Sequence, residues 1–191
     1  GWYKFRAADW GYSSPACVLW FAVDYNNNLW IYRELYTSKV TADVFARKVL
    51  ELESGEYIQY GVLDSSTWAK RGDVGPSIAE TMIQQGCRWR QSDRSPKSRI
   101  SGKLEIHKRL LVNDKEPGLR IFKNCRNLIR TLGTLPTDDK NPEDVDTNAE
   151  DHAYDALRYG CMSRPMHPTY AKRFKPMFTP EFKPADNKFG Y

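Results

Sequence analysis

The 191-residue sequence lacks any run of about 18 apolar residues, the minimum for a membrane-spanning helix, and it has no N-terminal secretion signal. It also lacks paired cysteines. Its four cysteines, Cys17, Cys87, Cys125 and Cys161, are far apart and form no C-x-x-C pair, which disfavours a zinc knuckle or a redox motif. We expect buried thiols in a reducing compartment and no membrane partner.

What is present indicates one globular domain with a sizeable core. Hydrophobic residues make up 40% of the chain and aromatic residues 13%, which argues against disorder. A net charge of +5 permits binding to a polyanion, but an ordinary basic protein would have the same charge. The chain begins at Gly1, and a strand follows at once, so we expect an excised domain of a longer protein or a processed chain.

Apolar patterning predicts a mixed sheet with helices on both faces, an α/β architecture. The predicted strands are Trp2–Asp9, Ala16–Asp24, Leu29–Leu35, Tyr57–Leu63, Arg88–Gln91 and Leu119–Phe122. The predicted helices are Thr41–Leu52, Pro76–Gln85, Pro96–Val112, Lys123–Leu132 and a last one within Asn148–Met162.

Two details of the helices are also predicted. In Pro96–Val112, residues Ile100, Leu104, Leu110 and Leu111 form the expected apolar side. Gly133 is the expected stop of the helix Lys123–Leu132. Both expectations rest on local pattern alone.

The chain changes character after Arg164. Residues 165–191 are rich in Pro, Lys and aromatics without periodicity, so we predict a folded domain at 1–164 and an extended basic tail at 165–191. We expect removal of Lys172–Tyr191 to leave the melting temperature nearly unchanged.

Acidic residues follow two predicted strands and open the last helix. Asp9 and Asp64 end their strands, and Asp151 and Asp155 lie in the first turns of the helix. Functional groups gather at the carboxyl ends of strands in open α/β sheets, and carboxylate oxygens suit Mg²⁺ or Mn²⁺. Each residue could instead cap a turn or complement a helix dipole, so the pattern leaves capping and metal binding both open.

Spacing makes Asp155 a neighbour of two residues in the helix. Asp151 and Asp155 are i and i+4, so they share a face, and His152 and Asp155 are i and i+3, so they are also neighbours. One carboxylate could ligate a cation while a neighbour orients it.

Three stretches together resemble a known family. They are "AADWGYSSPACVLW", "YGVLDSSTW" and "NPEDVDTNAEDHAYDALRY", and they resemble the nuclease domain of the large terminase subunit of tailed bacteriophages. The resemblance covers roughly Trp2 to Met162, and the acidic-His-x-x-Asp-Ala-Leu-Arg-Tyr element is its most specific part. It implies a ribonuclease H-like fold and a metal-dependent nuclease domain at 1–164.

The resemblance also implies residue roles. Asp9, Asp64 and Asp151 would be the metal-binding triad for two Mg²⁺ or Mn²⁺ ions, with Asp155 as an accessory catalytic carboxylate. Many relatives carry a second acidic residue where His152 stands, so His152 is given only an accessory place.

The implied function is a metal-dependent endonuclease that cuts concatemeric viral double-stranded DNA during packaging, with little sequence specificity. Its implied partners are DNA, the portal protein and the small terminase subunit, in the cytoplasm of an infected bacterium. The family's N-terminal ATPase is not expected here, because the chain has no G-x-x-x-x-G-K-[ST] motif. The alternatives are another ribonuclease H-like nuclease, such as a junction resolvase or transposase-like domain, and a non-catalytic module that docks on DNA or a portal.

Basic residues in two segments are candidates for DNA-backbone contacts. The segments are "KRGDVG" and "RWRQSDRSPKSRISGK", and arginine and lysine in such runs contact phosphates without reading sequence. The candidates are Lys70, Arg71, Arg94, Lys97, Arg99 and Lys103. A solvated basic face is the alternative explanation.

Overall fold

The computed structural model describes residues 1–70, 75–113, 116–139, 142–146 and 149–166. Six strands form one mixed sheet in the order β5-β4-β1-β2-β3-β8, and β6 and β7 form a separate pair. The strands of the main sheet are β1 Tyr3–Asp9, β2 Ala16–Val23, β3 Leu29–Thr37, β4 Gly61–Leu63, β5 Arg90–Gln91 and β8 Leu119–Ile121. The small pair consists of β6 Val112–Asn113 and β7 Glu116–Pro117.

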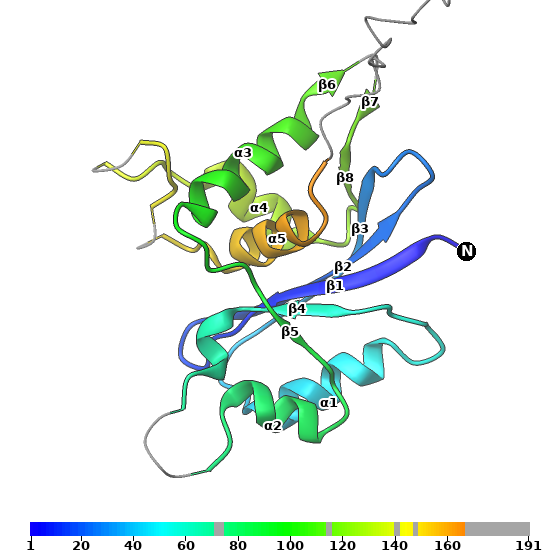
Figure 1. The fold of residues 1–191 in the computed structure, drawn as a ribbon, viewed down its shortest axis with the longest axis vertical. Helices are drawn as coiled ribbons and strands as arrows, with labels where there is room; N and C mark the ends of the chain where they lie inside the picture. The colour runs from blue at the N-terminus through cyan, green and yellow to red at the C-terminus, as the bar shows by residue number, and fades with distance from the viewer. Residues whose placement is uncertain (71–74, 114–115, 140–141, 147–148, 167–191) are drawn as a thin grey trace, which may run out of the picture.

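Helices cover both faces of the main sheet, as predicted (Figure 1). The α-helices are α1 Ala42–Leu52, α2 Ile78–Gln84, α3 Ser98–Leu110, α4 Arg126–Thr134 and α5 His152–Ser163, and η1 Ser65–Trp68 is a short 3-10 helix. Helices α1 and α2 lie on one side, while α3, α4 and α5 lie on the other. Among the described residues, no helix is both long enough and apolar enough to cross a bilayer.

The first three strands form an antiparallel meander held by a local turn. β1 pairs with β2 from Tyr3 opposite Val23 to Asp9 opposite Cys17. In the turn before β3, the Asp24 carboxylate accepts hydrogen bonds from the backbone amides of Asn26 and Asn28. Asn27 adopts a φ of 63°, a conformation that asparagine tolerates better than most residues.

A parallel strand then completes the edge that carries the acidic residues. β4 runs parallel to β1, with Ala8 opposite Leu63, and the Asp64 amide donates to the Ala8 carbonyl at 3.1 Å. Because parallel strands end at the same edge of a sheet, Asp9 and Asp64 lie side by side at the ends of β1 and β4.

The sheet separates two hydrophobic cores. One contains Phe5, Phe21 and Leu157 between the sheet and α5, and the other contains Trp20 and Phe45 beneath α1 and α2. Close packing at α5 requires glycine: a Cβ on Gly160 would lie 2.3 Å from the Phe21 ring, and one on Gly102 of α3 would lie 2.4 Å from the Arg158 side chain. Both helices therefore lie unusually near their neighbours.

Several local expectations were wrong. Helix α3 buries Gly102, Glu105, Ile106 and Arg109, while Leu104 and Leu111 of the expected apolar side are 56% and 61% exposed. A buried ion pair, with Arg109 Nε 3.0 Å from Glu105 Oε1, replaces the apolar contact that the pattern suggested.

Other helices and strands differ in length or number from those predicted. Gly133 lies inside α4, which continues to Thr134. The strand expected over Tyr57–Leu63 is confined to Gly61–Leu63, and the β6–β7 pair was not predicted. Of the tail proposed at 165–191, residues 167–191 lie outside the described residues.

Candidate active site

Asp9 is a buried carboxylate at the carboxyl end of β1. It is 9% exposed, and its Oδ2 lies 3.0 Å from Nδ1 of His152. Burial raises the pKa of Asp9 to about 7, against the lowering effect of the His152 hydrogen bond, and the negative charges of Asp155 and Asp64 raise it further. The chain therefore holds Asp9 where its charge is poorly compensated.

Asp64 lies at the equivalent end of β4 and caps η1. Its carboxylate accepts a hydrogen bond from the Ser66 amide at 3.2 Å and another from the Ser66 hydroxyl. The Tyr159 hydroxyl of α5 lies 3.4 Å from Asp64 Oδ1 and 3.5 Å from Asp155 Oδ2, so it joins the strand end to the helix.

Asp151 occupies the N-cap position of α5, but its side chain makes no capping hydrogen bond. Burial and the nearby charge of Asp155 raise the pKa of Asp151 to about 6. Arg99 is a distant ion-pair partner, with Nη2 3.8 Å from Asp151 Oδ2. Because the side chain does not cap the helix, capping does not explain the acidic start of α5.

His152 connects the helix start to β1. Its hydrogen bond to Asp9 raises the pKa of the imidazole, since the carboxylate favours the charged ring, and Asp151 and Asp155 add to this effect. The histidine thus partly offsets the negative charge of the carboxylate cluster, which consists of Asp9, Asp64, Asp151 and Asp155.

Asp155 differs from the other carboxylates because both of its oxygens have cationic partners. Arg158 Nε lies 3.0 Å from Oδ1, and Arg99 Nη1 lies 3.3 Å from Oδ2. Arg99 also donates to Asp144 Oδ2 at 2.8 Å, which ties the loop after α4 to the site. Three of these partners, Arg158, Tyr159 and Asp144, were missed from the sequence, although Arg158 and Tyr159 belong to the quoted "DALRY" element.

The basic candidates divide into two groups. Lys70, Arg94 and Lys97 are exposed, and Lys97 precedes α3 with a φ of 65°. Arg99 and Lys103 face the protein: Arg99 contacts the carboxylates, and Lys103 Nζ donates to the Pro142 and Asp144 carbonyls at 3.2 and 3.1 Å. Arg71 lies outside the described residues.

The chemistry of the cluster fits a hard cation better than it fits a softer one. Its carboxylates supply oxygen ligands, and the raised pKa values of Asp9 and Asp151 indicate excess negative charge that a cation would neutralise. In the part of the chain that the structure describes, however, no three His, Cys, Asp or Glu side chains form a ready-made ion site. Binding would therefore require side-chain adjustment.

Sequence comparisons and structural comparisons give different results. No protein-family profile matches the chain, and no curated protein sequence matches it. Solved structures do match.

Three of the matching structures are large terminases or nuclease domains of large terminases. The large terminase of a thermophilic bacteriophage superposes with a TM-score of 0.67 at 13% identity, over 84% of this chain and 39% of that one. The nuclease domain of the P22 large terminase superposes with a TM-score of 0.64 at 17% identity, over 85% of this chain and 81% of that one.

The large terminase nuclease of thermophilic phage G20c with bound zinc is a third match. Its TM-score is 0.57 at 14% identity, over 86% of this chain and 82% of that one. These likenesses confirm the predicted ribonuclease H-like α/β fold and, at the level of fold, the resemblance to terminase nuclease domains. The chain spans about two fifths of the length of the first of these three proteins.

Proposed function

We propose that this domain is a metal-dependent endonuclease that hydrolyses phosphodiester bonds of double-stranded DNA. The observation that carries the proposal is the cluster formed by Asp9, Asp64 and the acidic start of α5, in which Asp9 and Asp151 have raised pKa values. Strongly shifted carboxylates that meet at the end of a sheet are candidates for a functional site. The fold shared with terminase nuclease domains supports the same function.

In this proposal Asp9, Asp64 and Asp151 hold two Mg²⁺ or Mn²⁺ ions. Asp151 suits the role because its side chain makes no capping hydrogen bond and its ion-pair contact in the described part of the chain is a long one to Arg99. Bound cations of this kind activate a water and stabilise the leaving oxygen of a phosphodiester. The G20c nuclease has been solved with bound cobalt and with bound zinc, which is consistent with a divalent-cation site in this fold.

Asp155 and His152 would act through their neighbours. Asp155 is held by Arg158 and Arg99, so it fixes the start of α5 and keeps Arg99 beside the cluster. His152 forms a hydrogen bond between its Nδ1 and Oδ2 of Asp9, which would fix the orientation of that carboxylate.

The exposed cations would contact the DNA backbone. Lys70, Arg94 and Lys97 are accessible in the structure, and contacts of this kind position DNA without reading its sequence. Arg99 and Lys103 instead tie the 142–146 segment to α3. Little sequence specificity is therefore expected.

The biological setting is inferred from the length of the match. Since the chain corresponds to most of the P22 nuclease domain, we propose that it works as the nuclease part of a large terminase. It would cut concatemeric viral DNA in the cytoplasm of the infected bacterium, with an ATPase motor, a small terminase subunit and a portal protein as partners.

The direct test is plasmid cleavage. Supercoiled plasmid incubated with the protein and Mn²⁺ or Mg²⁺ should be nicked and then linearised, and a chelator should stop the reaction. Products of many lengths are expected, whereas a few discrete fragments would indicate a resolvase-like specificity. DNA binding without any cleavage would favour the docking-module alternative.

Plasmid cleavage and melting temperature, measured on the same variants, separate the roles of Asp151 and Asp155. Asp151→Asn should reduce cleavage by roughly 100-fold or more while slightly raising the melting temperature in chelator, because a crowded charge is removed. Asp155→Asn should reduce cleavage by about 10- to 100-fold and lower the melting temperature, because Arg158 loses a buried partner. A higher melting temperature in Asp155→Asn than in Asp151→Asn would exchange the two roles.

A further inference from the structure

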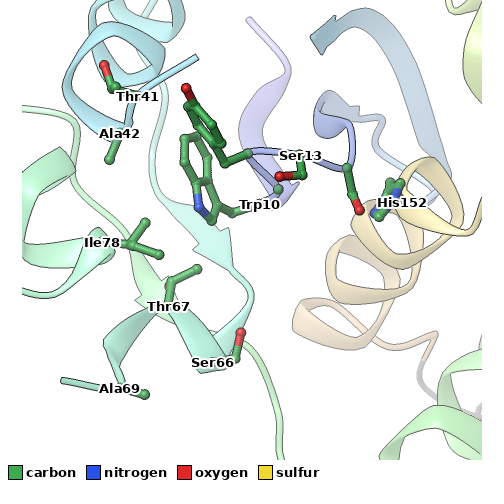
Figure 2. Close-up of a pocket in the computed structure, with 12 residues that line it drawn as sticks. Trp10, Ser13, Thr41, Ala42, Ser66, Thr67, Ala69, Ile78 and His152 are labelled. Carbon is green, nitrogen blue, oxygen red and sulfur yellow. The ribbon is translucent and has the colours of Figure 1, made fainter. Parts of the chain in front are cut away.

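A cavity of about 740 Å³ has Ser66 and His152, the partners of Asp64 and Asp9, in its wall, and Figure 2 shows the side chains that line it. The loop after β1, the start of α1, η1 and the first residue of α2 form its walls, and His152 closes one side. Its size is within the usual range for sites that bind small organic groups. Phosphodiester hydrolysis at the cluster does not by itself require such a space.

The described lining is neutral and partly aromatic. Apart from His152, it contains no ionisable side chain other than the phenol of Tyr12, and it includes the hydroxyls of Ser13, Thr41 and Thr67. Tyr12 is 54% exposed, while Trp10 is fixed by an edge-on contact with Phe45 at 5.0 Å between ring centroids. Such a wall suits a flat, uncharged group with hydrogen-bonding edges better than it suits a free anion.

The loop that supplies the aromatic residues is held in place. A Cβ on Gly11 would lie 2.5 Å from the Ser14 carbonyl oxygen, so the loop folds back tightly at a position that only glycine fits. The Lys39 amide donates to the Tyr12 carbonyl at 2.8 Å, which anchors the loop to the segment before α1. The wall is therefore largely formed before any ligand arrives.

Two lining residues also contact the carboxylates. His152 hydrogen-bonds Asp9, and Ser66 donates its hydroxyl to Asp64, so both strand-end carboxylates have a partner on the cavity wall. The cavity wall therefore adjoins the carboxylates that would hold a phosphodiester in the proposed function.

We propose that the cavity receives one unpaired nucleoside of the DNA strand that is cut, next to the scissile phosphate. This inference rests on the proposed nuclease function and adds a substrate feature to it. A base leaves the duplex most easily at a mismatch, where the cost of unpairing and unstacking is lowest. Tyr12 would offset that cost by stacking on the base, as aromatic side chains do in proteins that bind single strands.

Cleavage of paired and mismatched duplexes tests the proposal. With Mn²⁺, the wild-type protein should cut next to a single mismatch roughly 10-fold faster than it cuts the matched duplex. Tyr12→Ala should reduce that ratio to about 1, because the stacking partner is lost. Tyr25→Ala is the matched control, since Tyr25 is 93% exposed in the turn between β2 and β3 and should keep the wild-type ratio. An equal ratio in wild type and Tyr12→Ala would overturn the proposal.

A binding measurement separates this inference from the nuclease function. The dinucleotide d(TpT), titrated in chelator and followed by NMR, should perturb Trp10 and His152 signals in the wild type and bind several-fold more weakly to Tyr12→Ala. Binding without cleavage of any duplex would keep the nucleoside site and reject the nuclease. Cleavage with no mismatch preference and no dinucleotide binding would support the nuclease function and reject the nucleoside site.

Discussion

Arg6 and Asp9 lie three residues apart on β1, and their charges are compensated to very different degrees. Arg6 faces the α1 side, where Nη1 lies 2.8 and 2.6 Å from the two oxygens of Glu53 and Nη2 donates to the Arg88 carbonyl. Trp20 Nε1 donates to the same Glu53 at 2.7 Å. Asp9 faces α5, where the charges of Asp155 and Asp64 raise its pKa and, among the described residues, His152 is the partner that lowers it.

Arg6 belongs to a buried ion pair, whereas Asp9 lies where neighbouring carboxylates disfavour its charged form. A buried charge that only supports the fold is matched by an opposite charge and hydrogen bonds, because an unmatched one costs several kcal/mol. The Asp9 cluster retains that cost. A bound cation, as proposed, would offset that cost, so we expect mutations at the two positions to have opposite effects on stability and activity.

The largest expected effect is on catalysis. Asp9→Asn should lower Mn²⁺-dependent plasmid cleavage by about 1,000-fold, since a neutral amide no longer attracts the cation. The metal-free variant should melt no lower than the wild type, because a destabilising charge is gone. Glu51→Gln, an exposed change of the same kind on α1, is the control and should leave cleavage unchanged. Wild-type cleavage by Asp9→Asn would remove Asp9 from the site.

The second-largest expected effect is a loss of stability when the Arg6–Glu53 ion pair is broken. Glu53→Gln leaves Arg6 buried without a countercharge, which should cost about 3–5 kcal/mol and lower the melting temperature by roughly 10 °C. Cleavage per folded molecule, measured well below the melting temperature, should stay close to wild type. If Glu53→Gln strongly reduced cleavage without changing the melting temperature, the assignment of a structural role to Glu53 and a catalytic role to Asp9 would be contradicted.

The smallest effect is the pH dependence of the metal-free protein. The folded-state pKa values of Asp9 and Asp151, about 7 and about 6, exceed the unfolded value of 3.8. The folded state therefore holds protons that the unfolded state releases between about pH 4 and 7, and stability falls as pH rises through this window. His152, whose pKa is also raised, acts in the same direction. From about pH 5.5 to 8 in chelator, the melting temperature should fall by roughly 5 °C.

Added cation should reverse that trend. Mn²⁺ competes with protons for the carboxylates, so it should raise the melting temperature more at about pH 8 than at about pH 5.5. Asp9→Asn should show a shallower pH dependence in chelator. A pH profile identical to wild type in this variant would place the responsible proton elsewhere.

The sequence predicted the meander and α5 well because their apolar patterns are local and strong. It failed where burial does not follow hydrophobicity. Helix α3 buries the Glu105–Arg109 ion pair, which looks like a solvent-exposed pair in sequence, and Gly133 continues α4 although glycine usually ends a helix. Which residues a helix buries, and where it ends, depends on the elements that pack against it, and these elements are distant in the sequence.

The candidate site shows the same limit. Strand ends and helix spacing indicated Asp9, Asp64, Asp151 and Asp155, and the roles assigned to them remain predictions. Asp144 was missed because it lies in an irregular loop, and only the 2.8 Å contact with Arg99 reveals its place. Arg99, expected among the DNA contacts, is held among the carboxylates, since partners far apart in sequence determine where a long side chain points.

The parallel pairing of β1 with β4 also has a consequence for the order of folding. The β1–β2–β3 meander needs only short turns, so it forms from contacts close in sequence, which are the fastest to form. Asp64 joins Asp9 only after the chain has closed the longer crossover through α1 and docked β4. The α5 carboxylates are the last to be synthesised, because that helix is the last described element of the chain, and they reach the site only when α5 packs on β1 and β2. A chain synthesised only as far as α4 therefore lacks Asp151 and Asp155, and the carboxylate cluster is complete only once α5 has packed on the sheet.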